Sequence, residues 1–318
     1  MISEFDLIAR YFSRPAHSAI LGVGDDAAVV EPSEGHETVV TIDTLVCGTH
    51  FLSDAEPRAI GHKALAVNLS DLAAMGARPR WVLLAITLPE VDEDWMSEFA
   101  DGFYRLAWKY GVDLIGGDTT RGPLAVTVTA IGEAPAGMAL RRDGARHGDE
   151  IWVSGQIGSA ALALAHVRGD VRLKGRGLEE CLAKLHTPVP RIELGRELAG
   201  IANSAIDISD GLVADANHVA QRSGVRVEIS YADVPCVAEA MAMKKQPPAR
   251  QAILAGGDDY ELLFTVPPDR SALIDAISAR LGLGLTRIGR ICTGSGVVVL
   301  DGSGEAIDLK VKGHDHFG

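Results

Sequence analysis

Two spacings of apolar residues alternate along the chain, and they predict an alternation of strands and helices. The strands predicted in the first half are residues 27–31, 38–43, 81–88, 112–115 and 124–132. The long helices predicted there are residues 57–75 and 94–110. The first of these begins at Pro57 and carries Ala64, Leu65, Leu69 and Leu72 on one apolar stripe.

The second half repeats this alternation with shorter elements. The predicted strands are residues 150–154, 205–209, 225–229, 260–266, 287–291 and 297–300. The predicted helices are residues 159–167, 178–185, 191–203, 212–222 and 271–281. Strands and helices that alternate in this way are typical of an α/β or α+β fold.

A polar stretch that contains arginines separates the two halves. Pro135, Gly137, Gly144 and Gly148 interrupt it, and such punctuation is typical of a domain junction. The chain has 318 residues, which suggests two domains at roughly 150 residues each. We therefore expect an N-terminal domain over residues 1–136 and a C-terminal domain over residues 137–318.

The net charge of the chain argues against two classes of binding partner. The chain has 30 Lys+Arg and 43 Asp+Glu, a formal net charge of −13, and 47% of its residues are hydrophobic. A globular protein with this charge is repelled by nucleic acids and by anionic membranes, so we expect neither as a partner. Small-molecule substrates remain the expected partners.

The cysteines and the N-terminal sequence favour the cytoplasm. Cys47, Cys181, Cys236 and Cys292 form no CxxC pair, which argues against a zinc ribbon or a disulfide scaffold and fits a reducing compartment. The N-terminal sequence lacks a basic segment followed by an apolar core, so no signal peptide is expected. No apolar run reaches the roughly 20 residues that span a bilayer.

Several aspartates lie in unusually apolar surroundings. Asp43 follows the β-branched run 39–42, and Asp207 lies inside the apolar run 205–209. Asp71 interrupts a helix that is otherwise expected to be buried, and Asp118 follows a short strand and two glycines. Desolvated carboxylates are costly unless a cation compensates them. Because the nearby ligands are oxygens, the pattern indicates Mg²⁺ and a nucleotide bound through metal ions.

The common nucleotide-binding and hydrolase motifs are absent. The sequence has no GxxxxGK[ST] loop, no HRD and DFG pair, and no complete GxGxxG, since Gly22 and Gly24 lack a third glycine. It also has no GxSxG and no HExxH. The sequence therefore does not predict a P-loop, protein-kinase or Rossmann nucleotide site.

Seven segments in a fixed order carry a resemblance to a known family. They are residues 22–28 (GVGDDAA), 41–51 (TIDTLVCGTH and Phe51), 63–77 (KALAVNLSDLAAMGA), 116–122 (GGDTTRG), 207–212 (DISDGL), 256–262 (GGDDYEL) and 313–317 (GHDHF). Together they resemble the thiamine-monophosphate kinase family, within the aminoimidazole ribonucleotide synthetase-like superfamily. The segments span nearly the whole chain.

The resemblance implies a fold and an activity. The implied fold has two domains: an N-terminal α/β domain that dimerises and binds metal and ATP, and a C-terminal α/β domain that completes the nucleotide and substrate site. The implied reaction is ATP-dependent phosphorylation of thiamine monophosphate to thiamine diphosphate, with several Mg²⁺ ions. A monovalent cation is a further candidate cofactor, and a homodimer is the expected assembly.

The resemblance also assigns roles to individual residues. The implied metal ligands are Asp26, Thr41, Ile42, Asp43, Asp71, Asp118, Asp207 and Asp210. The implied nucleotide contacts are Gly117, Asp118, Arg142 and Ser209, and the implied substrate contacts are His50, Asp258 and His314. Asp71, Asp118 and Asp210 are expected to be catalytic. The family usually has Glu at position 258 and an aromatic residue at position 314, so this chain departs from its pattern on the substrate side.

Alternatives stay open at this stage. Asn68 or Lys63 could satisfy Asp71 within a purely structural helix, His50 could be a packing residue, and Arg142 could only cap a loop. The acceptor could be that of selenophosphate synthetase, a hydrogenase-maturation dehydratase or aminoimidazole ribonucleotide synthetase. A non-catalytic acidic protein that binds divalent cations is the remaining alternative.

Overall fold

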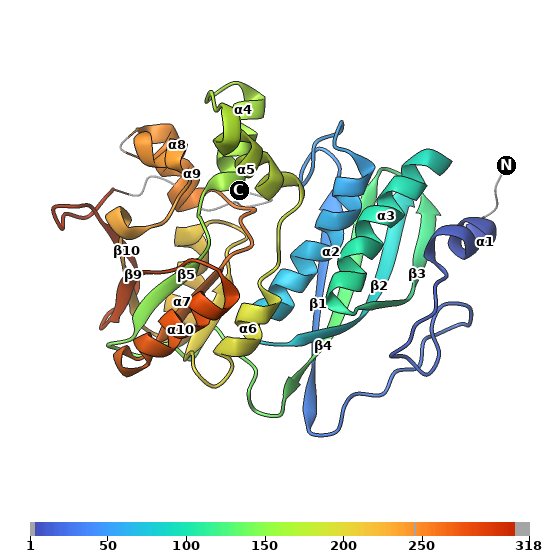
Figure 1. The fold of residues 1–318 in the computed structure, drawn as a ribbon, viewed down its shortest axis with the longest axis horizontal. Helices are drawn as coiled ribbons and strands as arrows, with labels where there is room; N and C mark the ends of the chain where they lie inside the picture. Colours follow the sequence, from blue (N-terminus) through green and yellow to red (C-terminus); the bar gives the residue numbers. More distant parts are fainter. Residues whose placement is uncertain (1–3, 245, 309–318) are drawn as a thin grey trace. The chain divides into compact units, whose positions relative to one another are not determined.

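Two β-sheets, each with its own helices, organise the chain in the computed structural model, which describes residues 4–244 and 246–308 (Figure 1). The chain divides into a first unit of residues 1–72 and 77–137 and a second unit of residues 73–76 and 138–318. Each unit has a core of its own, and each is described separately below.

The first unit contains a four-stranded sheet in the order β1-β4-β2-β3. Its strands are β1 (His36–Val46), β2 (Arg78–Leu88), β3 (Asp113–Arg121) and β4 (Ala125–Pro135). β4 pairs antiparallel with β1 and β2, whereas β2 and β3 are parallel. The parallel pair requires a crossover, and a helix supplies it.

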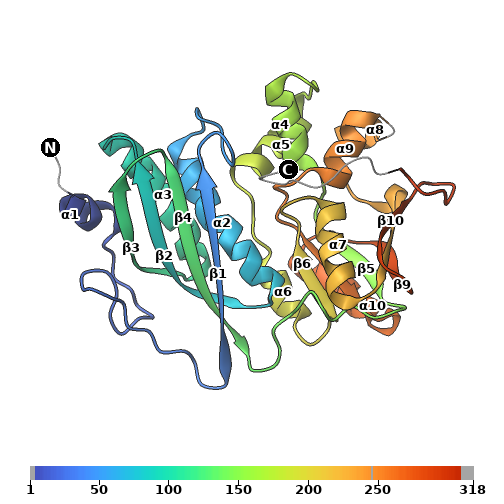
Figure 2. The ribbon, with the colours of Figure 1, turned by 180° about the vertical axis from the view of Figure 1, so that it is seen from behind.

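Helices α2 (Pro57–Ala74) and α3 (Glu93–Tyr110) cover one face of this sheet, as Figures 1 and 2 show from opposite sides. Asp92 caps α3 by accepting hydrogen bonds from two backbone N–H groups, and Gly111 ends the helix in the left-handed conformation at φ 64°. Two short segments, α1 (Glu4–Leu7) and the π-helix η1 (Ile8–Phe12), precede a long loop that leads to β1.

The two long helices approach each other closely because each has a glycine at the contact. A Cβ atom on Gly61 would lie 2.1 Å from the carbonyl oxygen of Phe99. A Cβ atom on Gly102 would lie 1.9 Å from the carbonyl oxygen of Arg58. Both distances are far below van der Waals contact, so this packing excludes any larger residue at either position.

The second unit contains a six-stranded sheet in the order β10-β7-β9-β5-β8-β6. The strands are β5 (Glu150–Ser154), β6 (Ser204–Asp207), β7 (Arg226–Ser230), β8 (Leu262–Val266), β9 (Leu285–Cys292) and β10 (Gly296–Leu300). Neighbouring strands are antiparallel except for β10 and β7. Every residue of β6 and β8 is buried, so both faces of the sheet are covered there.

The helices of the second unit fill the sequence between these strands. They are α4 (Ser159–Arg168), α5 (Gly175–His186), α6 (Ile192–Leu198), α7 (Leu212–Ser223), α8 (Ala238–Ala242), α9 (Pro247–Ala255) and α10 (Ser271–Leu281). Two short 3₁₀ segments are η2 (Tyr231–Asp233) and η3 (Pro268–Arg270). Of these elements, α7 packs on β6, β7 and β10.

The structure confirms the mixed α/β class and most of the predicted elements, with four differences. Residues 27–31 do not form the predicted strand, because only Val29 pairs there, in an isolated bridge with Leu21. β3 is longer than predicted, so it includes Asp118 instead of ending before it. α6 stops at Leu198, well before the predicted end at residue 203. Sequence spacing also missed α8 and α9, both of which are short.

Candidate active site

The inward face of β1 and the adjoining face of α2 bring three predicted metal-site residues together. The Thr41 hydroxyl donates a hydrogen bond of 2.5 Å to Oδ2 of Asp71. The backbone N–H of Asp43 donates to Oδ1 of the buried Asn68 at 3.1 Å, and the Asn68 amide donates to the Ala64 carbonyl. These contacts fix the register between strand and helix, so Thr41, Asp43 and Asp71 occupy one small region of the first unit.

Lys63 and Asn68, the alternative partners of Asp71, each make contacts with other residues. Lys63 is 3% exposed and donates from Nζ to the backbone carbonyl of His50 at 3.0 Å. Asn68 bonds to Ala64 and Asp43, as described above. One partner of the Asp71 carboxylate is the hydroxyl of Thr41, which is itself a predicted ligand.

His50 lies in the turn that follows β1. Its Nδ1 accepts a hydrogen bond of 3.0 Å from the backbone N–H of Val46, which fixes the tautomer as the one that carries its proton on Nε2. The Lys63 ammonium holds the backbone of the same residue through the His50 carbonyl. The imidazole is half-buried, so its position is set by the fold.

Asp26 lies on an exposed turn of the long loop between η1 and β1. The backbone N–H of Asp26 donates to Oδ1 of Asp25 at 2.8 Å. Before this turn, the N–H and hydroxyl of Ser18 both donate to Oδ2 of Asp113 at 2.7 Å. Beyond it, the N–H and hydroxyl of Ser33 donate to the carboxylate of Glu133. The turn that carries Asp26 is therefore tied to the sheet on both sides.

Gly117 and Asp118 occupy the middle of β3, where both are exposed. Gly117 has φ 156°, and a Cβ atom there would lie 1.8 Å from the Leu84 carbonyl oxygen, so only glycine fits beside β2. Asp118 pairs with Ala85 in the parallel ladder.

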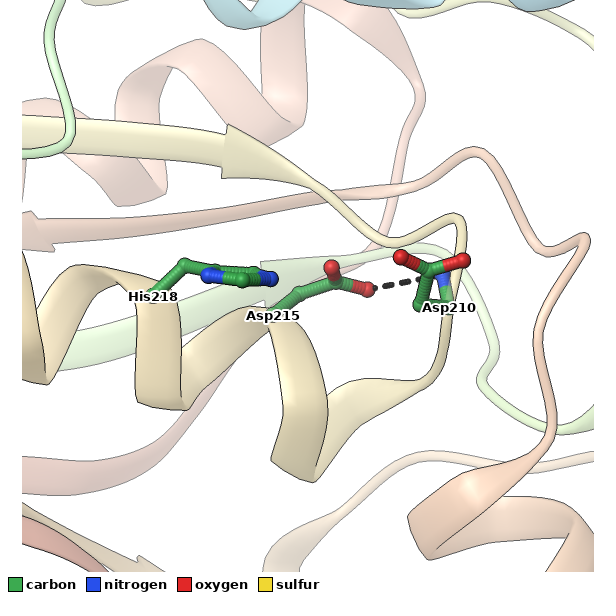
Figure 3. Close-up of side chains that lie close together, drawn as sticks. All are labelled: Asp210, Asp215 and His218. Carbon is green, nitrogen blue, oxygen red and sulfur yellow. Dashed lines mark hydrogen bonds between the residues drawn. The ribbon is translucent and has the colours of Figure 1, made fainter. Parts of the chain in front are cut away.

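In the second unit, the turn from β6 into α7 carries Asp207, Ser209 and Asp210. Asp207 is the last residue of β6 and is 3% exposed. The backbone N–H groups of Ser209, Asp210 and Gly211 all donate to Oδ2 of Asp215, each at 3.1 Å. Figure 3 shows the bond from Asp210. Burial and the neighbouring Asp210 carboxylate raise the pKa of Asp215 to about 7, although the three N–H groups oppose this shift.

One group of acidic and histidine side chains has metal-binding spacing among the residues that the structure describes. It consists of Asp210, Asp215 and His218, with one ligand atom from each lying within 4.8 Å of the others (Figure 3). No three of Asp26, Asp43, Asp71 and Asp118, all described residues, form such a group. Carboxylates repel one another unless a cation lies between them.

The segment 256–262 surrounds Asp258, a predicted substrate residue. Asp258 and Tyr260 have positive φ values of 67° and 49°, which are unusual for residues with side chains. The Tyr260 hydroxyl donates to Oδ1 of Asp258 at 2.9 Å, and the N–H of Asp258 donates to the Ser209 carbonyl. The segment therefore packs its backbone against the turn that carries Ser209 and Asp210.

The two acids that follow Asp258 are fully buried and serve the fold. Asp259 accepts hydrogen bonds from the N–H groups of Gly158 and Ser159 at the start of α4, and burial raises its pKa to about 7. Glu261 accepts from the ammonium of Lys184 and from the guanidinium of Arg191. Burial opposes ionisation of Glu261, but these two cations outweigh it and lower the pKa of the carboxyl.

The remaining predicted residues are exposed or lie outside the described residues. Arg142 is exposed, and its backbone carbonyl accepts a hydrogen bond of 2.9 Å from the Ser223 hydroxyl. Ile42 is 62% exposed, so only its backbone oxygen suits a hard cation. His314 lies outside the described residues, as does the whole segment 313–317.

Sequence reasoning missed Asp215 and Glu261, and it considered Asn68 only as a partner of Asp71. The sequence signal for Asp215 is an acid in the first turn of the helix that follows DISDGL. The sequence gives no comparable signal for Asn68, because its role depends on which strand lies against α2. Glu261 lies inside the resembling segment 256–262, but its pairing with Lys184 and Arg191 joins residues about seventy positions apart.

One cavity lies away from all of these residues. It has a volume of about 410 Å³, is bounded by η1 and α3, and is lined by Arg10, Arg14, Tyr104 and Trp108 among others. The Arg14 guanidinium lies 4.2 Å from the Tyr104 ring centroid. Acidic side chains of α3 also line this cavity, so its charge is mixed.

No helix in the described part of the chain is long and apolar enough to cross a membrane.

Two known domain families match the chain, one in each half. Residues 24–134 match the AIR synthase related protein, N-terminal domain, and residues 146–302 match the AIR synthase related protein, C-terminal domain. The chain is 44% identical to thiamine-monophosphate kinase of Escherichia coli (strain K12) over 319 residues, covering 99% of this chain and 98% of the relative.

Two solved structures are similar over nearly the full length. The crystal structure of thiamine-monophosphate kinase from Stenotrophomonas maltophilia K279a is 46% identical, with a TM-score of 0.85 and 95% of each chain covered. A structure described as AaThiL complexed with AMPPCP and TMP is 35% identical, with a TM-score of 0.78, and covers 93% of this chain and 92% of the other.

Proposed function

Because the chain belongs to the thiamine-monophosphate kinase family, we propose that it transfers the γ-phosphoryl group of ATP to thiamine monophosphate. The products are thiamine diphosphate and ADP. The observation that carries this proposal is the similar structure of AaThiL, which is complexed with AMPPCP and TMP and matches nearly the full length of this chain.

The pattern of separate cysteines favours the cytoplasm as the compartment.

The chemistry of the acceptor supports direct transfer. A phosphate monoester has its second pKa at about 6, so near pH 7 the acceptor oxygen is already largely deprotonated. Such a nucleophile requires no strong general base, and the transfer proceeds in line without a phospho-enzyme. The task of the protein is to hold two anionic phosphates in register and to neutralise their charge.

The donor set fits Mg²⁺. The proposed ligands are the carboxylates of Asp26, Asp43, Asp71, Asp118, Asp207 and Asp210, with the Thr41 hydroxyl and the Ile42 carbonyl. All of these donors are oxygens, which hard cations prefer, and Thr41 already bonds to Asp71 in the structure. Bound Mg²⁺ would supply charge neutralisation to the transferring phosphoryl group and to the acceptor phosphate.

The other proposed residues orient the two substrates. We assign Gly117, Asp118, Arg142 and Ser209 to the nucleotide, with the exposed Arg142 guanidinium suited to phosphate oxygens. We assign His50, Asp258 and His314 to thiamine monophosphate. The fixed tautomer of His50 presents an Nε2–H donor, which suits a phosphate or hydroxyl acceptor on the substrate.

We also propose a division of roles and a dimer. Residues 1–136 supply the metal ligands Asp26 to Asp118 and the dimer contact, and residues 137–318 supply the remaining nucleotide and substrate contacts. The open face of the first sheet supports dimerisation, because β1 exposes Val40 by 60% and Ile42 by 62% on the side away from α2. Exposed apolar side chains on an edge strand are typical of an interaction surface.

One coupled assay tests the proposed reaction. Purified protein receives Mg-ATP with either thiamine monophosphate or free thiamine, and ADP release is measured. We expect ADP only with the monophosphate, because free thiamine lacks the anionic acceptor oxygen. ADP release with free thiamine but not with thiamine monophosphate would show that the chain is a kinase with a different substrate specificity. Absence of ADP with both, together with cation binding, would favour the non-catalytic alternative.

A further inference from the structure

The turn between β6 and α7 is organised by one carboxylate that the sequence did not single out. Oδ2 of Asp215 accepts hydrogen bonds from three consecutive backbone N–H groups, those of Ser209, Asp210 and Gly211, each at 3.1 Å. Asp215 is 2% exposed and belongs to the first turn of α7 (Figure 3). Its side chain therefore reaches back from the helix to the turn that precedes it.

The backbone carbonyl groups of the same turn are held by a different segment of the chain. The N–H of Asp258 donates to the Ser209 carbonyl, and the N–H of Tyr260 donates to the Ile208 carbonyl, both at 2.9 Å. Gly211 has φ 120°, and a Cβ atom on it would lie 2.8 Å from the Ala255 carbonyl carbon. The segment 256–260 thus holds one side of the turn, and Asp215 holds the other.

This arrangement changes what the N-terminus of α7 can bind. Free N–H groups at a helix N-terminus form a ready site for phosphate. Here Asp215 accepts three of them, and the carboxylates of Asp207 and Asp210 add negative charge to the same turn. Phosphate groups are therefore repelled from this turn unless a cation lies between them and the carboxylates.

The hydrogen bonds also bear on whether Asp215 is a metal ligand or a residue that shapes the backbone. Asp210, Asp215 and His218 have the spacing of a metal site, which makes Asp215 a candidate ligand. An oxygen that accepts three N–H groups has no lone pair left for a cation, because a carboxylate oxygen offers about two lone-pair directions. If Asp215 were a ligand, Oδ1 would have to bind the cation, and the variants below test that alternative. The contacts of Asp215 Oδ2 are thus those of a residue that shapes the backbone.

We propose that Asp215 is a positioning residue for the cation held by this turn. It fixes the backbone of residues 209–211, so that the Asp210 carboxylate is presented to a divalent cation, and it closes the α7 N-terminus to direct phosphate binding. This inference rests on the proposed function, because it takes Asp210 as a metal ligand.

Manganese binding by the full chain tests this role without measuring turnover. Mn²⁺ would be titrated in the presence of ADP and followed by electron paramagnetic resonance, at a temperature at which every variant is folded. We expect Asp215→Ala to weaken Mn²⁺ binding at least tenfold, because the turn loses the acceptor of three N–H groups. We expect Asp215→Asn to weaken it less than threefold, because the Asn carbonyl oxygen still accepts them.

Two further variants separate this role from a general loss of stability and from the proposed function. Asp92→Ala removes a comparable cap, which accepts from the N–H groups of Asp94 and Trp95 at the start of α3, and should leave Mn²⁺ affinity unchanged. Asp210→Asn removes the proposed ligand itself and should weaken binding at least tenfold. Unchanged affinity in Asp210→Asn would remove the metal assignment of the proposed function, and this inference with it.

If Asp210→Asn weakens Mn²⁺ binding as expected, two results would still overturn the positioning role of Asp215 and leave the proposed function standing. Unchanged Mn²⁺ affinity in Asp215→Ala would show that the turn does not depend on this carboxylate. Equal losses in Asp215→Asn and Asp215→Ala would show that Asp215 is a ligand, because the amide keeps the N–H acceptor but not the charge. If Asp215→Ala does not fold, Asp215→Ser replaces it, since the hydroxyl is too short to reach three N–H groups.

Discussion

At the residue scale, the hydroxyl of Thr41 and the carboxylate of Asp71 form a direct contact between two proposed metal-site residues. Their 2.5 Å hydrogen bond orients the carboxylate, and Asn68 holds the backbone of Asp43 beside it. Side chains that orient a ligand influence metal affinity because they determine where its lone pairs point. Thr41 therefore supports Asp71 whether or not its own oxygen binds a cation.

Asp71→Asn should lower kcat by more than about 100-fold and leave the fold intact. The amide keeps the shape of the side chain and can still accept the Thr41 hydrogen bond, but it lacks the charge that a cation requires. ADP release with thiamine monophosphate and the circular dichroism spectrum are the two measurements. Asp54→Asn changes an exposed acid that has no proposed role and should retain activity. Near-normal turnover of Asp71→Asn would remove Asp71 from the metal site.

A second carboxylate of the first unit predicts a pH dependence of stability. Glu133 is 3% exposed and accepts hydrogen bonds from Ser33 and from Arg80, the latter at 2.5 Å. Burial raises the pKa of Glu133, but Ser33 and Arg80 outweigh this effect and hold it below its ordinary value of 4.5. A depressed folded-state pKa means that the contribution to stability is full above pH 4.5 and is lost as the pH falls through the folded value.

Glu133→Gln should therefore flatten the acid side of the stability profile of the first unit. At pH 7 the variant should be less stable by about 2 kcal/mol, because Arg80 loses a charged partner. The difference between variant and parent should shrink as the pH falls below 4.5. Urea unfolding at a series of pH values measures both effects, and a difference that is independent of pH would contradict the assignment.

At the element scale, the contact between α2 and α3 depends on the absence of two side chains. Gly61 and Gly102 let the helix backbones approach until a Cβ atom would overlap a carbonyl oxygen of the facing helix. Glycine inside a helix costs up to about 1 kcal/mol relative to alanine when the residue is exposed. At this contact the steric term is larger, so glycine is the more stable choice.

Gly102→Ala should destabilise the first unit by about 3 kcal/mol or more, despite the gain in helix propensity. The reason is that the new Cβ atom would lie 1.9 Å from the Arg58 carbonyl oxygen, and backbone atoms cannot rotate away. Thermal and urea unfolding measure the loss. Gly284→Ala is the matched control, because a Cβ atom there meets nothing within 4 Å, and its stability should hardly change.

The same scale shows which elements could be predicted and which could not. Long helices with clear periodicity, α2 and α3, begin and end within one residue of their predicted bounds, whereas β1 extends beyond the predicted residues 38–43 at both ends. The strand predicted over residues 27–31 is wrong, because a strand needs a partner and within these residues only Val29 pairs, in an isolated bridge with Leu21. The helices α8 and α9 are too short to show several turns of periodicity, and tertiary packing stabilises helices of this length.

At the scale of the whole molecule, the two units differ in how their sheets are covered. Strands β6 and β8 of the second sheet are buried on both faces, whereas the helices in the described part of the chain cover only one face of the first sheet. On the open face, the Thr44 and Thr127 hydroxyls bond to each other at 2.8 Å, and Val40 and Ile42 are exposed. A second copy of the chain would cover these apolar side chains.

Val40→Lys should weaken the proposed dimer at least about tenfold, which corresponds to about 1.4 kcal/mol. An ammonium group on the open face must be desolvated when a second copy covers it, whereas in the monomer it stays in water. Analytical ultracentrifugation over a range of concentrations measures the change. Val91→Lys alters a similarly exposed residue of the loop before α3 and should leave assembly unchanged. Equal assembly of both variants would place the dimer contact elsewhere.

The sequence by itself determined the class of fold and the family, and it predicts the kind of ligand. Apolar periodicity is a local property, and the segments from GVGDDAA to GGDDYEL keep their order along the chain, so both are visible in the string of residues. Aspartates in apolar runs, with no histidine or cysteine nearby, likewise indicate a hard cation through their residue type and neighbours alone.

Only the tertiary structure decided which atoms meet. The bond from Thr41 to Asp71 joins a strand to a helix, and the approach of Gly61 to Phe99 depends on how two helices pack. The three N–H groups on Asp215 are close in sequence, but they converge in a turn whose other side is held by the distant segment 256–260. Such contacts depend on the register and packing between elements, which no local pattern of residues encodes.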